Sequence, residues 1–314
     1  MIKKIIIYFL IVTALLYGLR YLHYKGLLMQ QNGYYGKYKT CFFKKNDFNV
    51  LFLGSSRVEM HYNTWLFDSL TKQNSFNLGL GGATPQVAFA VLKAYLQNSK
   101  APKYLLFEID YHFLKYKSSQ IKEFNNYFPF LSNKTLLNEF SKIDGRMSNF
   151  YYNPYYSWPY TGFKNISTSL HGWLNIQNKT DSLYYKGYLK EVLRPSLNYV
   201  PITKYYSFFN VTDRSYLDSI ITLCKKNNTE ITLITSPIFA GAKVDLLNKE
   251  QIINQLNNIA KINKISYYNL SSLSFCNERE RFIDHYHLNY SGATKFTLFL
   301  SNVFNNKLVT NTLK

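Results

Sequence analysis

Short continuous apolar runs recur along the chain and alternate with stretches in which apolar residues return every three or four positions. The runs cover residues 49–54, 75–80, 103–110, 230–237 and 265–270. An unalternating apolar run of this length is typical of a strand that is buried on both faces, as in parallel sheets. The periodic stretches between them predict amphipathic helices. We therefore expect a three-layer α/β/α fold around a mostly parallel sheet of about five strands.

Several helices have predictable starts. Thr84 before Pro85 is typical of an N-cap followed by proline in the first helical turn. Asp213, Asn248 and Ser291 stand at the beginning of three further periodic stretches. The last of these, which begins near Ser291, predicts the C-terminal helix.

The N-terminal 24 residues predict a membrane anchor. Two lysines precede an uncharged apolar run from Ile5 to Leu19, and Arg20 and Lys25 follow it. The run is shorter than the ~20 residues that a span prefers, but a snorkelling Arg20 extends it. Because no small-x-small cleavage site follows, we favour an uncleaved single-pass helix over a cleaved signal peptide. The N-terminus would lie inside and the remaining chain in the periplasm or outside the cell, where no nucleic-acid partner is expected.

The domain organisation follows from a break in the alternation. Residues 25–47 predict a connector, and residues 48–113 with 213–306 predict one α/β domain. The intervening residues 114–212 are too long for a crossover loop and predict an inserted subdomain. This insertion is rich in tyrosine, as in the run YYNPYYSWPY. Its rings either face sugars or a membrane interface, or form a satellite core on the sheet.

Charge and cysteine content narrow the picture only slightly. A formal net charge of +19 favours an anionic partner, or it reflects abundant surface lysine, so charge alone selects no substrate. The three cysteines are widely spaced and show no CxxC pairing. Cys224 lies on an apolar helical face, which indicates core packing.

The first candidate for chemistry follows the strand at 49–54. Gly54 permits a tight turn at the strand's C-terminal edge, and Ser56 then falls at the start of a helix. Open α/β sheets bind ligands at this edge, and helical N–H groups there point toward negative charge. The alternative role of these serines is a simple helix cap.

The second candidate is the Asp-x-x-His sequence at Asp284 and His287, just before the last helix. A serine becomes nucleophilic when a base takes its proton, and the base needs a carboxylate to orient it. A solvated polar loop is the alternative. The third candidate is the glycine-rich turn at residues 79–84, whose N–H groups can approach a ligand closely; its alternative is a flexible turn.

Taken together and in this order, these segments resemble the SGNH hydrolases, also called the GDSL family. The blocks that match cover Gly54, Ser55, Ser56, then Asn77, Gly79, Gly81, Gly82, Thr84, and finally Asp284 and His287. The resemblance implies that Ser56 is the nucleophile, that Gly82 beside Gly81 donates to the oxyanion, and that Asp284 orients the base His287. It covers residues 48–113 and 213–305 and leaves the anchor and the insertion unmatched.

The sequence departs from this family at two points. The family's third block carries an oxyanion-binding asparagine, but here His112 occupies that position, two residues after Asp110. Ser55 replaces the usual aspartate, and Arg57 follows the nucleophile. The Arg57 cation either assists the oxyanion or pairs with Asp110 or Glu108.

The leading hypothesis is an extracytoplasmic serine esterase or O-acyltransferase that acts on a surface polysaccharide, with acetyl as the expected acyl group. Alternatives are a lipid or small-ester hydrolase and a catalytically silent glycan-binding protein. Anchored relatives of this kind, such as alginate acetylation proteins and the D-alanine-transfer protein of teichoic acid assembly, imply a multispanning membrane acyltransferase as partner. No cofactor and no metal are expected, although His285, His287 and Asp284 would be the ligands of a metal site. The remaining histidines, His23, His61 and His171, are expected at the surface or at an interface.

Overall fold

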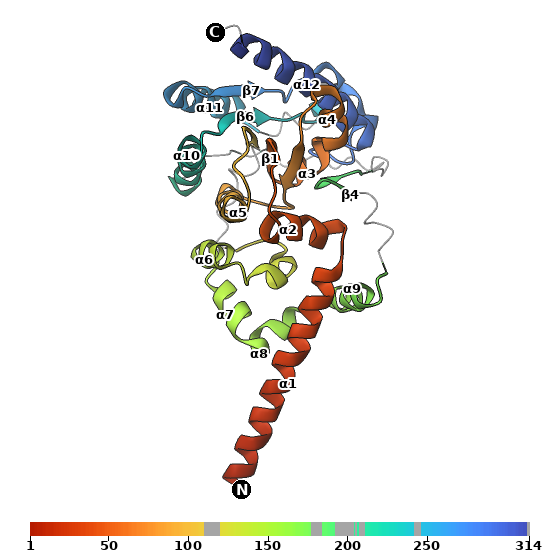
Figure 1. Ribbon diagram of the computed structural model, residues 1–314. Helices are drawn as coiled ribbons and strands as arrows, with labels where there is room; N and C mark the ends of the chain where they lie inside the picture. The colour runs from red at the N-terminus through yellow and green to blue at the C-terminus, as the bar shows by residue number, and fades with distance from the viewer. Residues whose placement is uncertain are drawn as a thin grey trace.

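The central sheet has five strands, and every neighbouring pair is parallel. The computed structural model describes residues 1–109, 120–176, 184–191, 204, 206, 211–241 and 246–312. The strand order is β2-β1-β3-β6-β7. Their bounds are β1 Val50–Gly54, β2 Ser75–Gly79, β3 Tyr104–Glu108, β6 Glu230–Thr235 and β7 Ser266–Asn269. The predicted three-layer α/β fold is confirmed, and each strand lies within a predicted apolar run (Figure 1).

Both faces of the sheet are buried because successive strand residues point into two different cores. Leu51 and Leu53 of β1 pack in one hydrophobic cluster, whereas Val50 and Phe52 pack in the other. This explains why the runs show no polar alternation.

Helices cover both faces. The first core also contains α5 (Pro85–Asn98), α10 (Val211–Lys226) and α11 (Lys249–Asn263). The second contains α3 (Ser56–His61), α4 (Thr64–Thr71) and α12 (Tyr290–Thr312). The Thr84 side chain caps α5 by accepting from the Val87 N–H at 3.4 Å, as predicted. Helix α10 begins at Val211, so Asp213 lies in its first turn, and α12 begins one residue before Ser291.

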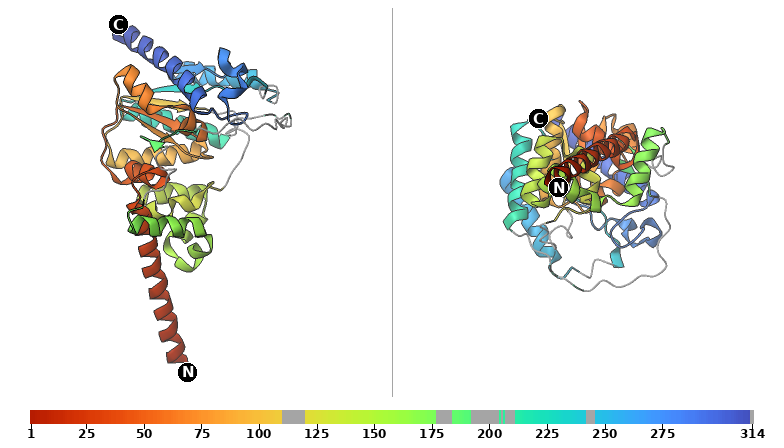
Figure 2. Two further views of the ribbon diagram at one scale, coloured as in Figure 1. Left: turned by 90° about the vertical axis from the view of Figure 1, so that its right-hand side faces the viewer. Right: turned by 90° about the horizontal axis from the view of Figure 1, so that it is seen from below.

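The N-terminal helix α1 (Ile2–Met29) projects away from the sheet, and the C-terminus lies at the opposite end of the molecule (Figure 2). Among the described residues it is the one helix that is long and apolar enough to cross a membrane, and no residue of its apolar window is buried. A signal sequence would meet the same criteria. Residues 25–47, predicted as a connector, contain the end of α1 and helix α2 (Gly33–Phe43), most of which is buried.

The described part of the insertion is mainly helical. It contains η1 (Phe124–Phe130), α6 (Lys134–Ile143), α7 (Arg146–Tyr152), α8 (Pro154–Ser157), η2 (Trp158–Tyr160) and α9 (Phe163–Trp173), with the hairpin of β4 (Tyr184–Tyr185) and β5 (Tyr188–Leu189). Residues such as Tyr127, Phe140 and Phe150 are buried in the same core as α2 and α5. Other rings, including Tyr152 and Tyr155, are exposed. The aromatic residues of the insertion are therefore divided between the core of the domain and its surface.

Candidate active site

Ser56 lies where β1 ends and α3 begins. Gly54 has a φ of +154°, which favours glycine, and a Cβ there would come within 2.6 Å of the Val58 side chain. Ser55 is the N-cap of α3, and its Oγ accepts from the Arg57 N–H at 3.2 Å. The two serines thus divide their roles: Ser55 caps the helix and Ser56 presents a half-buried hydroxyl at the C-terminal edge of the sheet.

The loop before α12 brings His287 and Asp284 to the same edge. Ser56 Oγ lies 2.8 Å from His287 Nε2, and His287 Nδ1 lies 2.8 Å from Asp284 Oδ2. The other carboxylate oxygen accepts from the main-chain N–H groups of Tyr286 and His287 at 2.8 and 2.9 Å. Residues more than two hundred positions apart therefore form one continuous hydrogen-bonded chain.

The direction of these hydrogen bonds follows from the Asp284 carboxylate, which can only accept. A carboxylate only accepts, so the neutral His287 ring carries its proton on Nδ1 and leaves Nε2 to accept from the Ser56 hydroxyl. Burial alone would raise the pKa of Asp284, but hydrogen bonds and charge from His287 and the two N–H groups lower this pKa to about 2. Asp284 is therefore ionised at neutral pH, and the tautomer is the one that a general base requires.

The glycine turn lies beside Ser56 because the Leu80 N–H donates to the carbonyl of Gly54 at 3.0 Å. Gly82 has a φ of +64°, a conformation that favours glycine. In the described part of the chain, the main-chain N–H groups of Gly81 and Gly82 donate to no other group. They are thus available to a ligand oxygen, although the structure itself contains no ligand.

Two residues of the insertion lie over this turn and were not identified from the sequence. The carboxylate of Glu123 is 3.5 Å from where a Cβ on Gly81 would stand, and the side chain of Lys122 is 2.6 Å from the corresponding point on Gly82. The insertion therefore contributes charged side chains to the neighbourhood of Ser56.

Arg57 points away from the site surface into the interior, where it is 1% exposed. Its Nε lies 3.2 Å from Oε1 of Glu108, which is fully buried. Its Nη2 donates to the carbonyl and hydroxyl of Ser236 at 2.6 and 2.9 Å. Of the two predicted roles of Arg57, the structure supports the ion pair with Glu108.

His61 is buried, which corrects the expectation of a surface or interface position; His23, in α1, is buried as well. His61 Nε2 accepts from the Leu288 N–H at 3.0 Å, so the proton resides on Nδ1, which donates to Ser236 Oγ at 2.8 Å. Burial lowers the pKa of His61 well below its usual value, which agrees with a neutral ring. Ser236 in turn donates to Glu108 at 2.6 Å.

A sequence signal for Ser236 exists. Like Ser56, it is a hydroxyl residue directly after a predicted strand, and the carboxyl ends of parallel strands share one edge. His61, five residues after Ser56, has no comparable signal.

Helix α2 also contacts the elements that carry the site, through Lys37. Lys37 Nζ donates to Oε1 of Glu59 in α3 at 2.9 Å and to the carbonyl of Gly79. Both charged side chains are almost fully buried. Burial lowers the pKa of Lys37 and raises that of Glu59, and the attraction between the two opposes both shifts.

The remaining predicted site residues, Asp110 and His112, lie outside the described residues. Within the residues that the structure describes, no group of three or more His, Cys, Asp or Glu side chains could hold a metal ion. All three cysteines belong to the described residues, are buried and form no disulfide.

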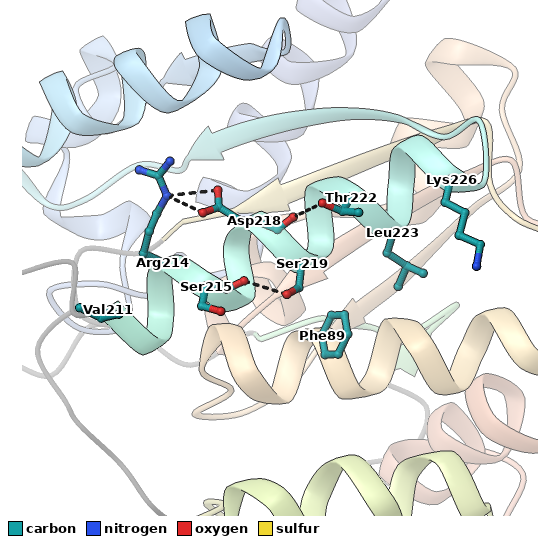
Figure 3. A pocket seen from close by; sticks show the side chains of 9 residues that line it. All are labelled: Phe89, Val211, Arg214, Ser215, Asp218, Ser219, Thr222, Leu223 and Lys226. Atoms are coloured by element: carbon teal, nitrogen blue, oxygen red, sulfur yellow. Dashed lines mark hydrogen bonds and ion pairs between the residues drawn. The ribbon is translucent and has the colours of Figure 1, made fainter.

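A groove of about 630 Å³ lies between α10 and Phe89 of α5, and Figure 3 shows the side chains that line it. Side chains of α10 line it, and the Arg214 and Asp218 pair stands at one end. None of its lining residues belongs to the group around Ser56, so it is separate from the candidate active site.

Comparisons with known proteins are weak. A protein-family model matches residues 198–309, less than half of the chain, and this range includes Asp284 and His287. Among curated proteins, none matches the sequence. A solved structure of a proposed acylhydrolase from Bacteroides fragilis is 13% identical, with 87% of this chain and 95% of that chain covered and a TM-score of 0.42.

A second solved structure is an active-site mutant of a family two carbohydrate esterase from Clostridium thermocellum. It is 8% identical, with 85% of this chain and 64% of that chain covered and a TM-score of 0.35. At these values neither likeness bears on the activity of this chain, which has to be judged from its own site.

Proposed function

We propose that this protein is a membrane-anchored serine esterase or O-acyltransferase that acts on a cell-surface polysaccharide outside the cytoplasm. The single observation that carries the proposal is the chain of hydrogen bonds from Asp284 through His287 to the Ser56 hydroxyl. Serine, histidine and carboxylate in this order activate the hydroxyl for attack on an ester.

The reaction begins when His287 Nε2 takes the Ser56 proton and Ser56 Oγ attacks the ester carbonyl carbon. Asp284 stabilises the imidazolium that results. The tetrahedral intermediate collapses when the C–O bond to the leaving alcohol breaks and the proton moves from His287 to that alcohol. An acyl-Ser56 ester remains, and water or a sugar hydroxyl resolves it by the same proton transfers in reverse order.

Oxyanion stabilisation is assigned to the N–H groups of Ser56 and Gly82, with Gly81 beside them. The first N–H groups of a helix have no partner within the helix, and those of Gly81 and Gly82 donate to no other described group. Each such donor contributes roughly 10²- to 10³-fold in rate. In the SGNH family an asparagine side chain supplies a further donor, and His112 occupies its position in this sequence.

The polysaccharide substrate is supported by the apolar helix α1, read as an uncleaved anchor, and by the net charge of +19, which suits an acidic polymer or membrane surface. Acetyl is the expected acyl group. A multispanning membrane acyltransferase as donor partner stays a proposal that rests on the family resemblance.

A fluorophosphonate probe tests the nucleophile directly. Full-length protein in detergent should be labelled covalently, and Ser56→Ala should abolish the labelling, whereas Ser215→Ala, which removes an exposed hydroxyl of α10, should leave it unchanged. Labelling that persists in Ser56→Ala would contradict the proposal. An unlabelled wild-type protein that binds glycan would favour the silent binding protein instead.

The length of the acyl chain in the hydrolysed ester distinguishes a carbohydrate esterase from a lipid hydrolase. Turnover of acetyl esters but not of long-chain esters supports a carbohydrate substrate, and the reverse supports a lipid hydrolase. Mass spectrometry of an added oligosaccharide then distinguishes transfer, which adds an acyl group to the sugar, from hydrolysis, which does not.

A further inference from the structure

The burial pattern of helix α9 is the reverse of that expected for a helix on a water-facing surface. Its large apolar residues lie along one stripe and point outward, with Phe163 86% and Leu170 58% exposed. Its buried residues are the small Ser169 and Gly172. A helix that packs on a soluble domain normally buries its apolar stripe, so this stripe requires an apolar surrounding.

The small residues of α9 pack directly on α1. A Cβ on Gly172 would overlap the carbonyl of Gly26, so the two backbones touch. Ser169 Oγ donates to the carbonyl of His23 at 2.8 Å. Small residues that let two backbones approach closely are typical of helix packing in membranes.

The tyrosine-rich segment before α9 contacts α1 still further toward its N-terminus. Tyr155 stacks on Phe9, and its hydroxyl lies 2.6 Å from Thr13 Oγ1. Tyr17 donates its hydroxyl proton to the carbonyl of Tyr152 at 2.7 Å. In Figure 1, α7 and α8 stand on one side of α1 and α9 on the other, while the N-terminal end of α1 projects beyond them.

The polar tips of these rings are satisfied within the protein. The indole N–H groups of Trp158 and Trp173 donate to the carbonyls of Leu16 and Leu22, at 3.4 and 3.0 Å. With the hydroxyls of Tyr17 and Tyr155 also bonded, the polar atoms of these four rings have no unmet hydrogen bond. Immersion in hydrocarbon requires this condition.

The depth of the contact can be estimated from α1. Arg20 and Lys25 mark the level where the span ends, with Lys25 Nζ 5.3 Å from the Trp173 ring. Thr13 lies seven residues before Arg20, which places its level about 10 Å deeper at 1.5 Å per residue. Tyr155 therefore stands within the outer leaflet, and α9, beside residues 19–26, stands at its surface.

An apolar groove of about 460 Å³ opens between α1 and α9. Its lining includes Leu19, Leu22, Trp158, Ile166, Leu170 and Trp173. It is continuous with the exposed stripe of α9, and its apolar lining suits a lipid acyl chain.

We propose that residues 151–176 form a second membrane contact, in which α9 lies in the boundary between headgroups and acyl chains of the bilayer that α1 crosses. The occupant of the stripe and of the groove is phospholipid. The anchor and this surface together hold the α/β domain at a fixed orientation above the membrane. The inference does not depend on the catalytic proposal.

Depth-dependent quenching tests it on the full-length protein in phosphatidylcholine bilayers. The natural cysteines are buried, so a bimane label on Phe163→Cys or Leu170→Cys reports one position. Leu10→Cys, on the exposed part of α1, is the positive control, and Thr222→Cys, on α10, is the negative control. Lipids brominated near the headgroup should reduce the emission at 163 and 170 and leave 222 unchanged, whereas lipids brominated deep in the acyl chain should reduce the emission at 10.

Two results would overturn the inference. In the first, the labels at 163 and 170 behave like the label at 222 while the label at 10 is quenched. In the second, the label at 10 is not quenched, because the inferred depth rests on α1 crossing the bilayer. Neither result affects fluorophosphonate labelling of Ser56, so this inference and the catalytic part of the proposed function fail separately.

Discussion

Two groups of serine, histidine and carboxylate lie side by side at one edge of the sheet, with their imidazole rings 6.5 Å apart. In the first group the order is Asp284, His287, Ser56, and the histidine stands in the middle. In the second the order is His61, Ser236, Glu108, and the serine stands in the middle.

The difference in order changes the chemistry. Ser56 donates its proton to an imidazole nitrogen with a free lone pair, whereas Ser236 donates to a carboxylate and His61 Nε2 is already occupied by the Leu288 N–H. The second group is also fully buried, while the His287 side chain is 25% exposed. Order and access to substrate, and not residue type alone, therefore decide which of the two serines suits the role of a nucleophile.

The two groups are joined at one bond, and this gives the second a function. Leu288 follows His287 directly, so His61, whose Nδ1 donates to Ser236 Oγ, fixes the backbone from which His287 projects. His61 is accordingly a positioning residue, and the buried group supports the exposed one.

The sharpest test of the difference is Asp284→Asn. An amide at this position can donate to His287 Nδ1, which favours the tautomer that cannot accept from Ser56. We expect kcat for an acetyl ester to fall roughly 10³- to 10⁴-fold, while the fold is retained. Steady-state kinetics of the full-length protein measure this. Asp218→Asn, which alters an exposed pair on α10, is the control and should stay within about twofold of wild type.

Arg57→Met should mainly lower stability. It removes one partner of a buried ion pair and leaves the charge of Glu108 uncompensated, which costs about 3–5 kcal/mol. Thermal unfolding in detergent should show the loss. Arg214→Met breaks an exposed pair and should cost about 0–1 kcal/mol. Equal effects of the two substitutions would mean that the buried group is not structural.

His61→Leu tests the link between the two groups. The Leu288 N–H loses its acceptor, for which we expect a cost of about 1–3 kcal/mol. Amide hydrogen exchange at Leu288 should accelerate, whereas exchange at Leu80, which is bonded to Gly54, should not change. A Leu288 amide that exchanges as slowly as in wild type would remove the positioning role from His61.

Ser55→Ala has the smallest expected effect. It deletes the N-cap of α3 and should lower stability by about 0.5–2 kcal/mol, with Ser56 still labelled by the fluorophosphonate probe. Ser55→Thr keeps the hydroxyl and is the matched control in the same unfolding measurement. Loss of labelling in Ser55→Ala would show that the cap also orients the nucleophile.

The sheet could be predicted because a strand buried on both faces leaves a local mark, as in residues 49–54. The meeting of Ser56 and His287 could be predicted because strand ends and the loop before the last helix converge on one edge of such a sheet. The roles of Asp284 and Gly82 came from the family resemblance and remain to be measured.

Other features depend on contacts between distant segments, which no local sequence pattern indicates. His61 is buried because α3 packs under α12, which no nearby residue indicates. Residues 25–47 are rich in Gly, Tyr and Lys and therefore predict a connector, yet Tyr38 stacks on Tyr127 of the insertion with ring centroids 4.9 Å apart. The outward-facing apolar stripe of α9 cannot be recognised from the sequence, because it depends on which face of α9 packs on α1.

The buried pair of Lys37 and Glu59 has a practical consequence for anyone who wishes to crystallise the protein without its anchor. Removing everything before the first strand would delete α2 and leave the buried Glu59 carboxylate without its ion-pair partner, in the same short helix as Ser56. A secreted, anchor-free version should therefore start no later than Asn32, so that the helix carrying Lys37 is kept whole.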